Sequence, residues 1–160
     1  NELSKNIDAY RLSTYLVFDG GKVGLPIAWD YNIAWGLAEH GNAFSPEGFV
    51  IDGDYSDHLP FWWNSLWENK KFKSSIKRRY IAQRKTVLRN DNIGQLIEQF
   101  ENSLSQHQAL NFKKWPLMGK KIWPNKHKSQ PHKEELDLLK TWIEQRLIWL
   151  DQQWGMNATE

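Results

Sequence analysis

The chain has 160 residues, a formal net charge of +2, ten tryptophans and no cysteine. Without cysteine it can form neither a disulfide nor a thiolate metal site, and so small a charge does not predict a nucleic-acid partner. No apolar run reaches the roughly eighteen residues that a transmembrane helix needs. The large aromatic content predicts one domain over residues 1–155 with an aromatic core, followed by a flexible tail at 156–160.

A β-hairpin is predicted near the start of the chain. Residues 14–18 are β-branched and aromatic, Asp-Gly-Gly at 19–21 is a turn sequence, and residues 23–28 are again extended and apolar. Asp8 precedes this hairpin and Asp30 follows it. Antiparallel pairing therefore returns the two carboxylates to the same end of the ribbon, within reach of one bound metal or phosphate.

Helices are predicted in the rest of the chain. The first covers residues 59–68, the second spans the basic segment 70–89, and the third begins near residue 91. The last covers about 132–154 and ends at Gly155. The side chains expected to face the core are Phe61, Trp62 and Leu66 in the first helix, with Trp63 as a further candidate, Ile93, Leu96, Ile97, Phe100 and Leu104 in the third, and Leu136, Leu139, Ile143, Leu147, Leu150 and Trp154 in the last.

Two segments have more than one interpretation. Residues 39–53 form a long connection, which is either a surface excursion or a loop that shapes access to a site. The basic face of 70–89 is either a solvated helix face or a surface for an acidic substrate, such as a phosphorylated peptide. No binding motif supports nucleic acid there.

The residues that flank the hairpin carry a pattern. It reads N-x-D-x-x-R-x-S-[ST] from Asn6 and P-x-x-W-D-[FY]-[DN]-x-A-x-G from Pro26. With the Trp-rich stretches at 61–67 and 146–151, the chain resembles, over nearly its whole length, the CotH-type atypical protein kinases, a family named for a spore-coat kinase. The resemblance implies an α+β, mostly α fold: a protein-kinase-like carboxy-terminal lobe, with a short β-hairpin near the N-terminus followed by a packed helical bundle.

The resemblance also assigns roles to four residues. Asp8 takes the place of the catalytic Asp that orients the substrate hydroxyl, and Asp30 that of the Asp that holds Mg²⁺ against the nucleotide phosphates. Ser13 stands where the kinase loop pattern has a metal-binding Asn, and Asn32 where many family members have a second Asp, so both are assigned to cofactor binding. The alternative for Asp8 and Asp30 is a turn or helix-capping role.

A kinase also needs a loop over the phosphates and a Lys that pairs with them. The sequence contains neither G-x-G-x-x-G nor G-x-x-x-x-G-K-[ST]. An amino-terminal lobe of the same protein is therefore the expected partner. Mg²⁺ and ATP are expected to bind in the intact parent, not tightly to this fragment, which should be inactive alone.

Two functions stay open. The first is Mg²⁺-dependent transfer of phosphate from ATP to Ser or Thr of an extracytoplasmic or cell-surface protein. The second is a noncatalytic surface or adhesin-like binding module on the same fold, with exposed Trp residues that stack on sugars or protein partners.

Overall fold

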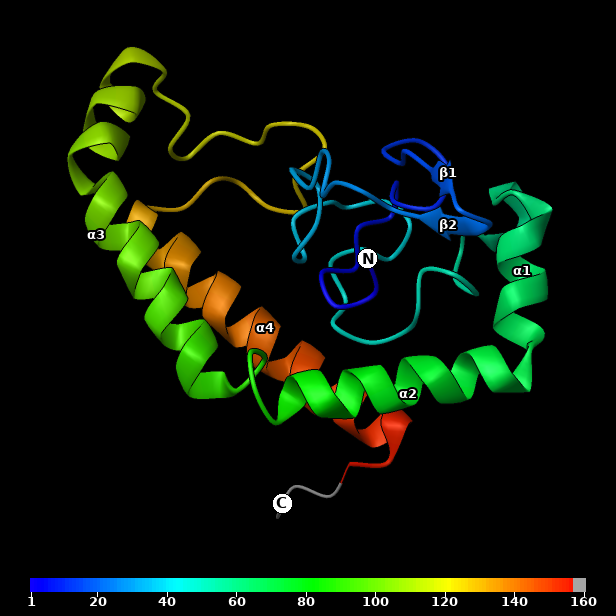
Figure 1. Cartoon of the computed structure of the whole chain (residues 1–160). Helices are drawn as coiled ribbons and strands as arrows, with labels where there is room; N and C mark the ends of the chain where they lie inside the picture. Colours follow the sequence, from blue (N-terminus) through cyan, green and yellow to red (C-terminus); the bar gives the residue numbers. More distant parts are fainter. Residues whose placement is uncertain (157–160) are drawn as a thin grey trace.

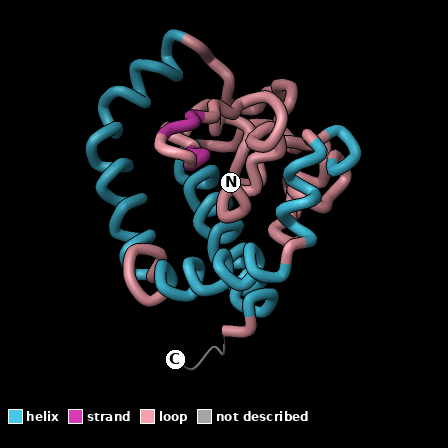
Figure 2. Tube along the Cα trace, turned by 45° about the vertical axis from the view of Figure 1, so that its right-hand side comes forward, coloured by secondary structure: helices cyan, strands magenta, loops and turns pink. Residues whose placement is uncertain are grey.

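The computed structural model describes residues 1–156, which form a mostly helical structure. Loops make up most of the first sixty residues, and the helices surround them on several sides (Figures 1 and 2). The elements are β1 (Val17–Asp19), β2 (Lys22–Gly24), the short 3₁₀ helix η1 (Ser56–His58), α1 (Phe61–Glu68), α2 (Lys70–Arg84), α3 (Asn90–Lys114) and α4 (His132–Trp154). No helix among residues 1–156 is long and apolar enough to cross a membrane.

The predicted hairpin is present. β1 and β2 pair antiparallel, with Val17 opposite Gly24 and Asp19 opposite Lys22. Gly20 and Gly21 form the turn with φ values of 53° and 76°. Positive φ at both central residues is the geometry that a two-residue hairpin turn requires, and glycine adopts it without strain.

The core lies along α4. Its side chains Ile143, Leu147, Leu150 and Trp154 are buried, as the stripe at three- and four-residue spacing predicts. Gly155 ends the helix in the left-handed conformation, with φ 63°. One apolar cluster joins α4 to α1 and the loops: Ile7, Tyr10, Ala38, Ala43, Val50, Ile51, Leu59, Trp63, Trp67, Leu150 and Trp154. A second cluster joins Trp142, Ile143 and Leu147 to partly buried Trp35, Ile93 and Ile97.

The predicted inward face of α1 is correct for Leu66, which packs against the core, and wrong for Phe61 and Trp62. Phe61 and Trp62 are 78% and 40% exposed, whereas Trp63 and Trp67 are buried. Trp63 and Trp67 lie four residues apart on one helix face, and both indole N–H groups find acceptors inside the fold. Trp63 Nε1 donates to the Tyr10 carbonyl at 2.9 Å, and Trp67 Nε1 donates to Asp52 Oδ2 at 2.8 Å.

The apolar stripe of α3 is only half covered. Ile93 and Ile97 pack against α4, but Leu96, Phe100 and Leu104 are exposed. The far end of α3 extends past the beginning of α4 (Figure 1), so the later turns have no helix beside them there. The predicted periodicity is correct, and the expected burial of these side chains is wrong.

Helix α2 is anchored at both ends. Asn69 Oδ1 accepts hydrogen bonds from the backbone N–H groups of Lys71 and Phe72 at 3.0 and 3.1 Å, which caps the first turn. At the other end, the Arg84 guanidinium donates to the Asp151 carboxylate of α4 at 2.9 Å. The helix ends at Arg84, five residues before the predicted position. Apart from Met156, the predicted tail lies outside the described residues.

Candidate functional site

One buried side chain, Asn6, connects the two segments that flank the hairpin. Asn6 is 0% exposed. Its Oδ1 accepts a hydrogen bond from the Asp8 backbone N–H at 3.3 Å, and its Nδ2 donates to the Asp30 carbonyl at 3.2 Å. Asp30 itself has φ 60°, a left-handed conformation that is uncommon for a residue other than glycine. The hydrogen bond from Asn6 therefore holds Asp30 in a backbone conformation that few residues other than glycine adopt.

A tight turn brings Ser13 to the same place. The backbone N–H groups of Leu12 and Ser13 both donate to the Asp8 carbonyl, at 2.9 and 3.3 Å. This turn reverses the chain, and Ser13 Oγ donates to Asp30 Oδ2 at 3.3 Å. Three of the four predicted site residues, Asp8, Ser13 and Asp30, are thus connected through Asn6 and this turn.

The Asp8 carboxylate has a cationic neighbour. Arg11 Nη2 lies 3.3 Å from Asp8 Oδ1, and both side chains are partly exposed. The Arg11 guanidinium also lies 5.3 Å from the centre of the Tyr55 ring. This pair leaves Asp8 Oδ2 without a hydrogen bond from any described residue. One oxygen of the predicted catalytic carboxylate is therefore available to a substrate hydroxyl.

Asn32 makes no hydrogen bond with these residues. Its side chain is exposed and makes no hydrogen bond with another residue in the range 1–156. It lines a cavity with Trp35 and Trp142, between the turn after Asp30 and α4. Its assignment to cofactor binding stays a prediction.

The donor atoms at Asp30 suit one kind of metal. They are a carboxylate and the neighbouring Ser13 hydroxyl, and residues 1–156 hold no group of three or more His, Cys, Asp or Glu side chains that could bind a metal ion. Mg²⁺ usually binds through one or two carboxylates together with water and substrate phosphates. The donor set therefore fits Mg²⁺ that arrives with a nucleotide, and it does not fit a metal held by protein ligands alone.

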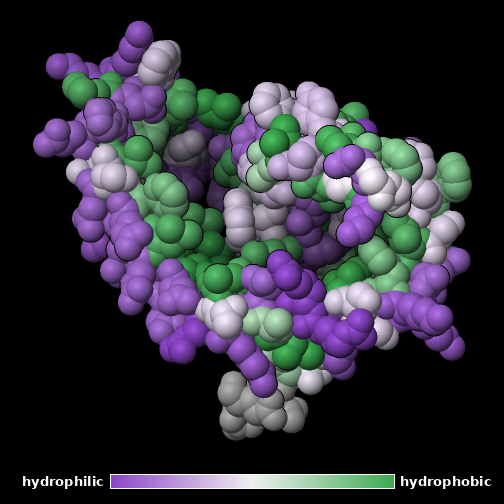
Figure 3. All heavy atoms as spheres, viewed as in Figure 1, coloured by the Kyte–Doolittle hydropathy of each residue, from purple (hydrophilic) through white to green (hydrophobic). Residues whose placement is uncertain are grey.

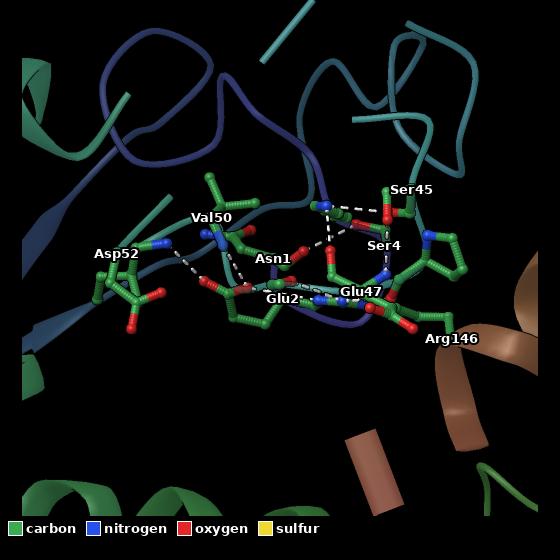
Figure 4. Close-up of polar contacts among 12 residues, drawn as sticks. Asn1, Glu2, Ser4, Ser45, Glu47, Val50, Asp52 and Arg146 are labelled. Atoms are coloured by element: carbon green, nitrogen blue, oxygen red, sulfur yellow. Dashed lines mark hydrogen bonds and ion pairs between the residues drawn. The ribbon is translucent and has the colours of Figure 1, made fainter. Parts of the chain in front are cut away.

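The loop 39–53 is fixed by the buried Arg146 and Lys5 and the partly buried Glu2, none of which was expected from the sequence (Figure 4). Arg146 of α4 is 0% exposed, and its Nη1 donates to the carbonyls of Pro46 and Gly48, both at 2.7 Å. The Glu2 carboxylate accepts the backbone N–H groups of Val50 and Ile51 at 2.9 and 3.0 Å. The loop is therefore not a free surface excursion.

Lys5 fixes the same loop from another direction. Its Nζ donates to the carbonyls of Asn42 and Ser45 at 2.8 and 3.0 Å, and also to that of Glu47. Burial lowers the pKa of Lys5 to about 8 and that of Arg146 to about 10. Burial raises the pKa of the Glu2 carboxyl, and its backbone hydrogen bonds and Arg146 oppose that shift.

Of Arg146, Glu2 and Lys5, only Arg146 has a feature in the sequence that could have indicated its buried role. It lies beside Ile143, Leu147 and Leu150 on the apolar stripe of α4, where a charged residue is unexpected. Glu2 and Lys5 lie in a polar segment, and their partners are backbone groups far along the chain. Contacts of this kind leave no spacing pattern in a sequence.

The motif glycine Gly36 has a steric role. Its φ is 83°, and a Cβ added there would lie 2.4 Å from Cδ1 of Trp142. Trp142 Nε1 in turn donates to the Phe44 carbonyl at 2.9 Å. The end of the second motif is thus held directly against α4 and the loop 39–53.

The fold and this site define a mostly helical protein in which two acidic residues, Asp8 and Asp30, flank a β-hairpin. Comparison with known families gives that class a name. Residues 1–150 match the family described as CotH kinase protein. The chain belongs to this family, which confirms the resemblance carried by the two motifs. No curated protein and no solved structure matches the chain.

Proposed function

We propose that this chain is the carboxy-terminal lobe of a CotH-type protein kinase, which transfers the γ-phosphoryl group of ATP to Ser or Thr of an extracytoplasmic or cell-surface protein. The observation that carries the proposal is that Asn6 bonds the backbone of both Asp8 and Asp30, and that the Ser13 hydroxyl donates to the Asp30 carboxylate. Membership of the CotH kinase family supports a kinase-like function in general.

In this proposal each side chain has a separate task. Asp8 orients the substrate hydroxyl and accepts its proton through the oxygen that Arg11 leaves open. Asp30 and Ser13 hold Mg²⁺. When bound, Mg²⁺ neutralises charge on the nucleotide phosphates. Cofactor binding by Asn32 stays a prediction, to be tested with the others.

The phosphates also need a clamp. The sequence has no glycine-rich phosphate loop of either common pattern. We therefore assign the clamp to an amino-terminal lobe of the same protein. The fragment 1–160 is expected to bind ATP weakly and to transfer no phosphate.

A noncatalytic binding module is the second candidate. Large aromatic side chains are exposed on this chain, among them Phe18 at 75% and Trp123 at 76%. Exposed aromatic rings favour stacking on sugars or on partner proteins. This candidate shares the fold but needs no phosphate transfer.

The test uses the full-length protein encoded by the gene. It measures Mg²⁺-dependent ATP binding and transfer of labelled phosphate to a Ser-rich protein, for the native protein and for Asp8→Asn, Ser13→Ala, Asp30→Asn and Asn32→Ala. Asp57→Asn is the matched control, because Asp57 is exposed and lies in η1. We expect Asp8→Asn and Asp30→Asn to lower transfer by about 100-fold or more, and Asp57→Asn to leave it unchanged.

Two results would overturn parts of this proposal. Transfer that survives Asp30→Asn would reject the metal role of Asp30. Full-length protein that binds no nucleotide would favour the binding module.

A further inference from the structure

A cavity lies between α2 and the N-terminal segment, on residues other than Asp8, Ser13 and Asp30. Its volume is about 620 Å³, within the range of about 300–1,000 Å³ that small-ligand sites occupy. Its walls are mainly apolar and aromatic, with Trp63 and Trp67 from α1, Ile76 from α2 and Trp154 from α4. The space-filling view shows the surface hollowed above α2 (Figure 3). A large apolar side chain of a partner could therefore be buried there.

Two cations stand at the rim of this cavity. Arg79 lines it and is exposed. Arg78 is also exposed, and its Nη2 donates at 3.0 Å to Oγ of Ser75, which lines the cavity too. Neither guanidinium has an ion-pair partner among residues 1–156. The rim thus presents two positive charges that are not neutralised.

All the charged side chains of α2 are positive. Its fifteen residues include seven cations and no acidic residue. Arg84 is neutralised by Asp151 of α4, and Lys73 Nζ lies 4.2 Å from the centre of the Trp67 ring. The remaining cations, Lys70, Lys71, Lys77, Arg78 and Arg79, are exposed. Because like charges on one face raise the local concentration of anions, the mouth of the cavity favours an acidic partner.

We propose that this cavity and the α2 cations bind an acidic peptide segment of a partner protein, with one apolar side chain inserted in the cavity and flanking carboxylates paired with Arg78 and Arg79. A charged surface alone gives weak and salt-screened binding. Burial of an apolar anchor adds affinity that salt does not remove. The combination explains why the basic face lies beside an open apolar cavity.

A single-stranded nucleic acid fits the same surface less well. Such binding needs aromatic faces exposed beside the cations, on which bases stack. The two aromatic residues of α2, Phe72 and Tyr80, are instead partly buried against the cavity. Peptide binding here depends on neither Asp8 nor Asp30, so it can be tested separately from phosphate transfer.

The experiment measures fluorescence anisotropy of a labelled peptide that carries acidic residues on both sides of a central Leu-Phe pair. Two further peptides replace the acidic residues by Lys or the Leu-Phe pair by Ser-Ser. The protein variants are Arg78→Ala with Arg79→Ala, which removes the rim charges, and Ser75→Trp, which fills the cavity from an exposed position. The matched control is Lys113→Ala with Lys133→Ala, which removes the same charge from exposed positions on α3 and α4.

We expect the acidic Leu-Phe peptide to bind, the rim variant to bind it about tenfold more weakly, and the control variant to bind it normally. Ser75→Trp should abolish binding while circular dichroism and thermal unfolding show that it is folded. Equal weakening by the control would reduce the effect to net charge and overturn the proposal. Equal binding of the Ser-Ser peptide would exclude insertion of an apolar side chain in the cavity. No binding of the Leu-Phe peptide would reject the site. Tighter binding of an RNA oligomer that depends on Arg78 and Arg79 would assign the surface to nucleic acid instead.

Discussion

Arg146 donates two hydrogen bonds to the carbonyl of Glu2, from Nε at 3.1 Å and from Nη2 at 2.6 Å. The two residues are 144 positions apart in the sequence. Arg146 also donates to carbonyls of the loop 39–53, and the Glu2 carboxylate accepts backbone N–H groups from it. This pair therefore joins the beginning of the chain, the loop 39–53 and the last helix.

The first prediction concerns the stability that depends on this pair. Arg146→Met removes the donor from the carbonyls of Glu2, Pro46 and Gly48 and leaves the Glu2 carboxylate without its cation. Removing one partner of a buried charge pair while the other remains typically costs about 3–5 kcal/mol. We therefore expect the free energy of unfolding to fall by about that amount. Urea unfolding, followed by tryptophan fluorescence, measures this free energy for the native chain and the variant. Lys133→Met, at an exposed position of the same helix, should change it by less than about 0.5 kcal/mol; similar losses in both variants would contradict the role of Arg146.

The second prediction concerns the pH dependence of stability at Lys5. Its pKa is about 8 in the folded chain against an ordinary value of 10.5, so above pH 8 the unfolded chain binds more protons than the folded one. The cost of burying this charge is therefore full below pH 8 and is relieved as the pH rises from about 8 to 10.5.

Unfolding of the native chain and of Lys5→Met at several pH values checks this. We expect the free energy of unfolding of the native chain, relative to that of the variant, to rise over this range. A difference that stays constant would show that Lys5 titrates normally, and one that falls would show a raised pKa in the folded chain; either result contradicts the prediction.

The third prediction concerns Gly36 and its contact with Trp142. Gly36→Ala should lower the free energy of unfolding by more than about 2 kcal/mol, because alanine is strained at positive φ and its Cβ would overlap the Trp142 ring. Gly94→Ala is the control. Gly94 lies inside α3, has open space around its Cα, and should gain roughly 0.5–1 kcal/mol on substitution. Thermal unfolding distinguishes the two, and a Gly36→Ala variant as stable as the native chain would contradict the steric explanation.

The fourth prediction concerns Asn6. Asn6→Ala leaves the Asp30 carbonyl without its donor and opens a small buried space, so we expect a loss of about 1–3 kcal/mol in the free energy of unfolding. Asn64→Ala, at an exposed position of α1, should have little effect.

The same pair of variants, made in the full-length protein, tests the proposed site. Asn6→Ala should reduce phosphate transfer more strongly than its stability loss explains, since it releases Asp30 from its left-handed conformation. Normal transfer by a folded Asn6→Ala protein would show that the position of Asp30 does not depend on Asn6.

Local features of the chain could be predicted from its sequence because local physics determines them. The turn at Gly20 and Gly21 follows from the need for positive φ, and the end of α4 at Gly155 from the same conformational freedom. The apolar stripe of α4 follows from the helical period. The two motifs around the hairpin were sufficient to indicate the family. The hydrogen bond from Ser13 Oγ to Asp30 Oδ2 joins one motif to the other in the folded chain.

Only the tertiary structure decided which faces are covered and how the site is supported. Trp62 stays exposed, whereas Trp63 is buried with its indole N–H donating to the Tyr10 carbonyl. The later turns of α3 stay exposed because they extend past the beginning of α4. Asn6 and Arg146 act through hydrogen bonds to backbone groups that lie far away in sequence. Every residue offers such backbone groups, so only the folded chain selects which of them meet a given side chain.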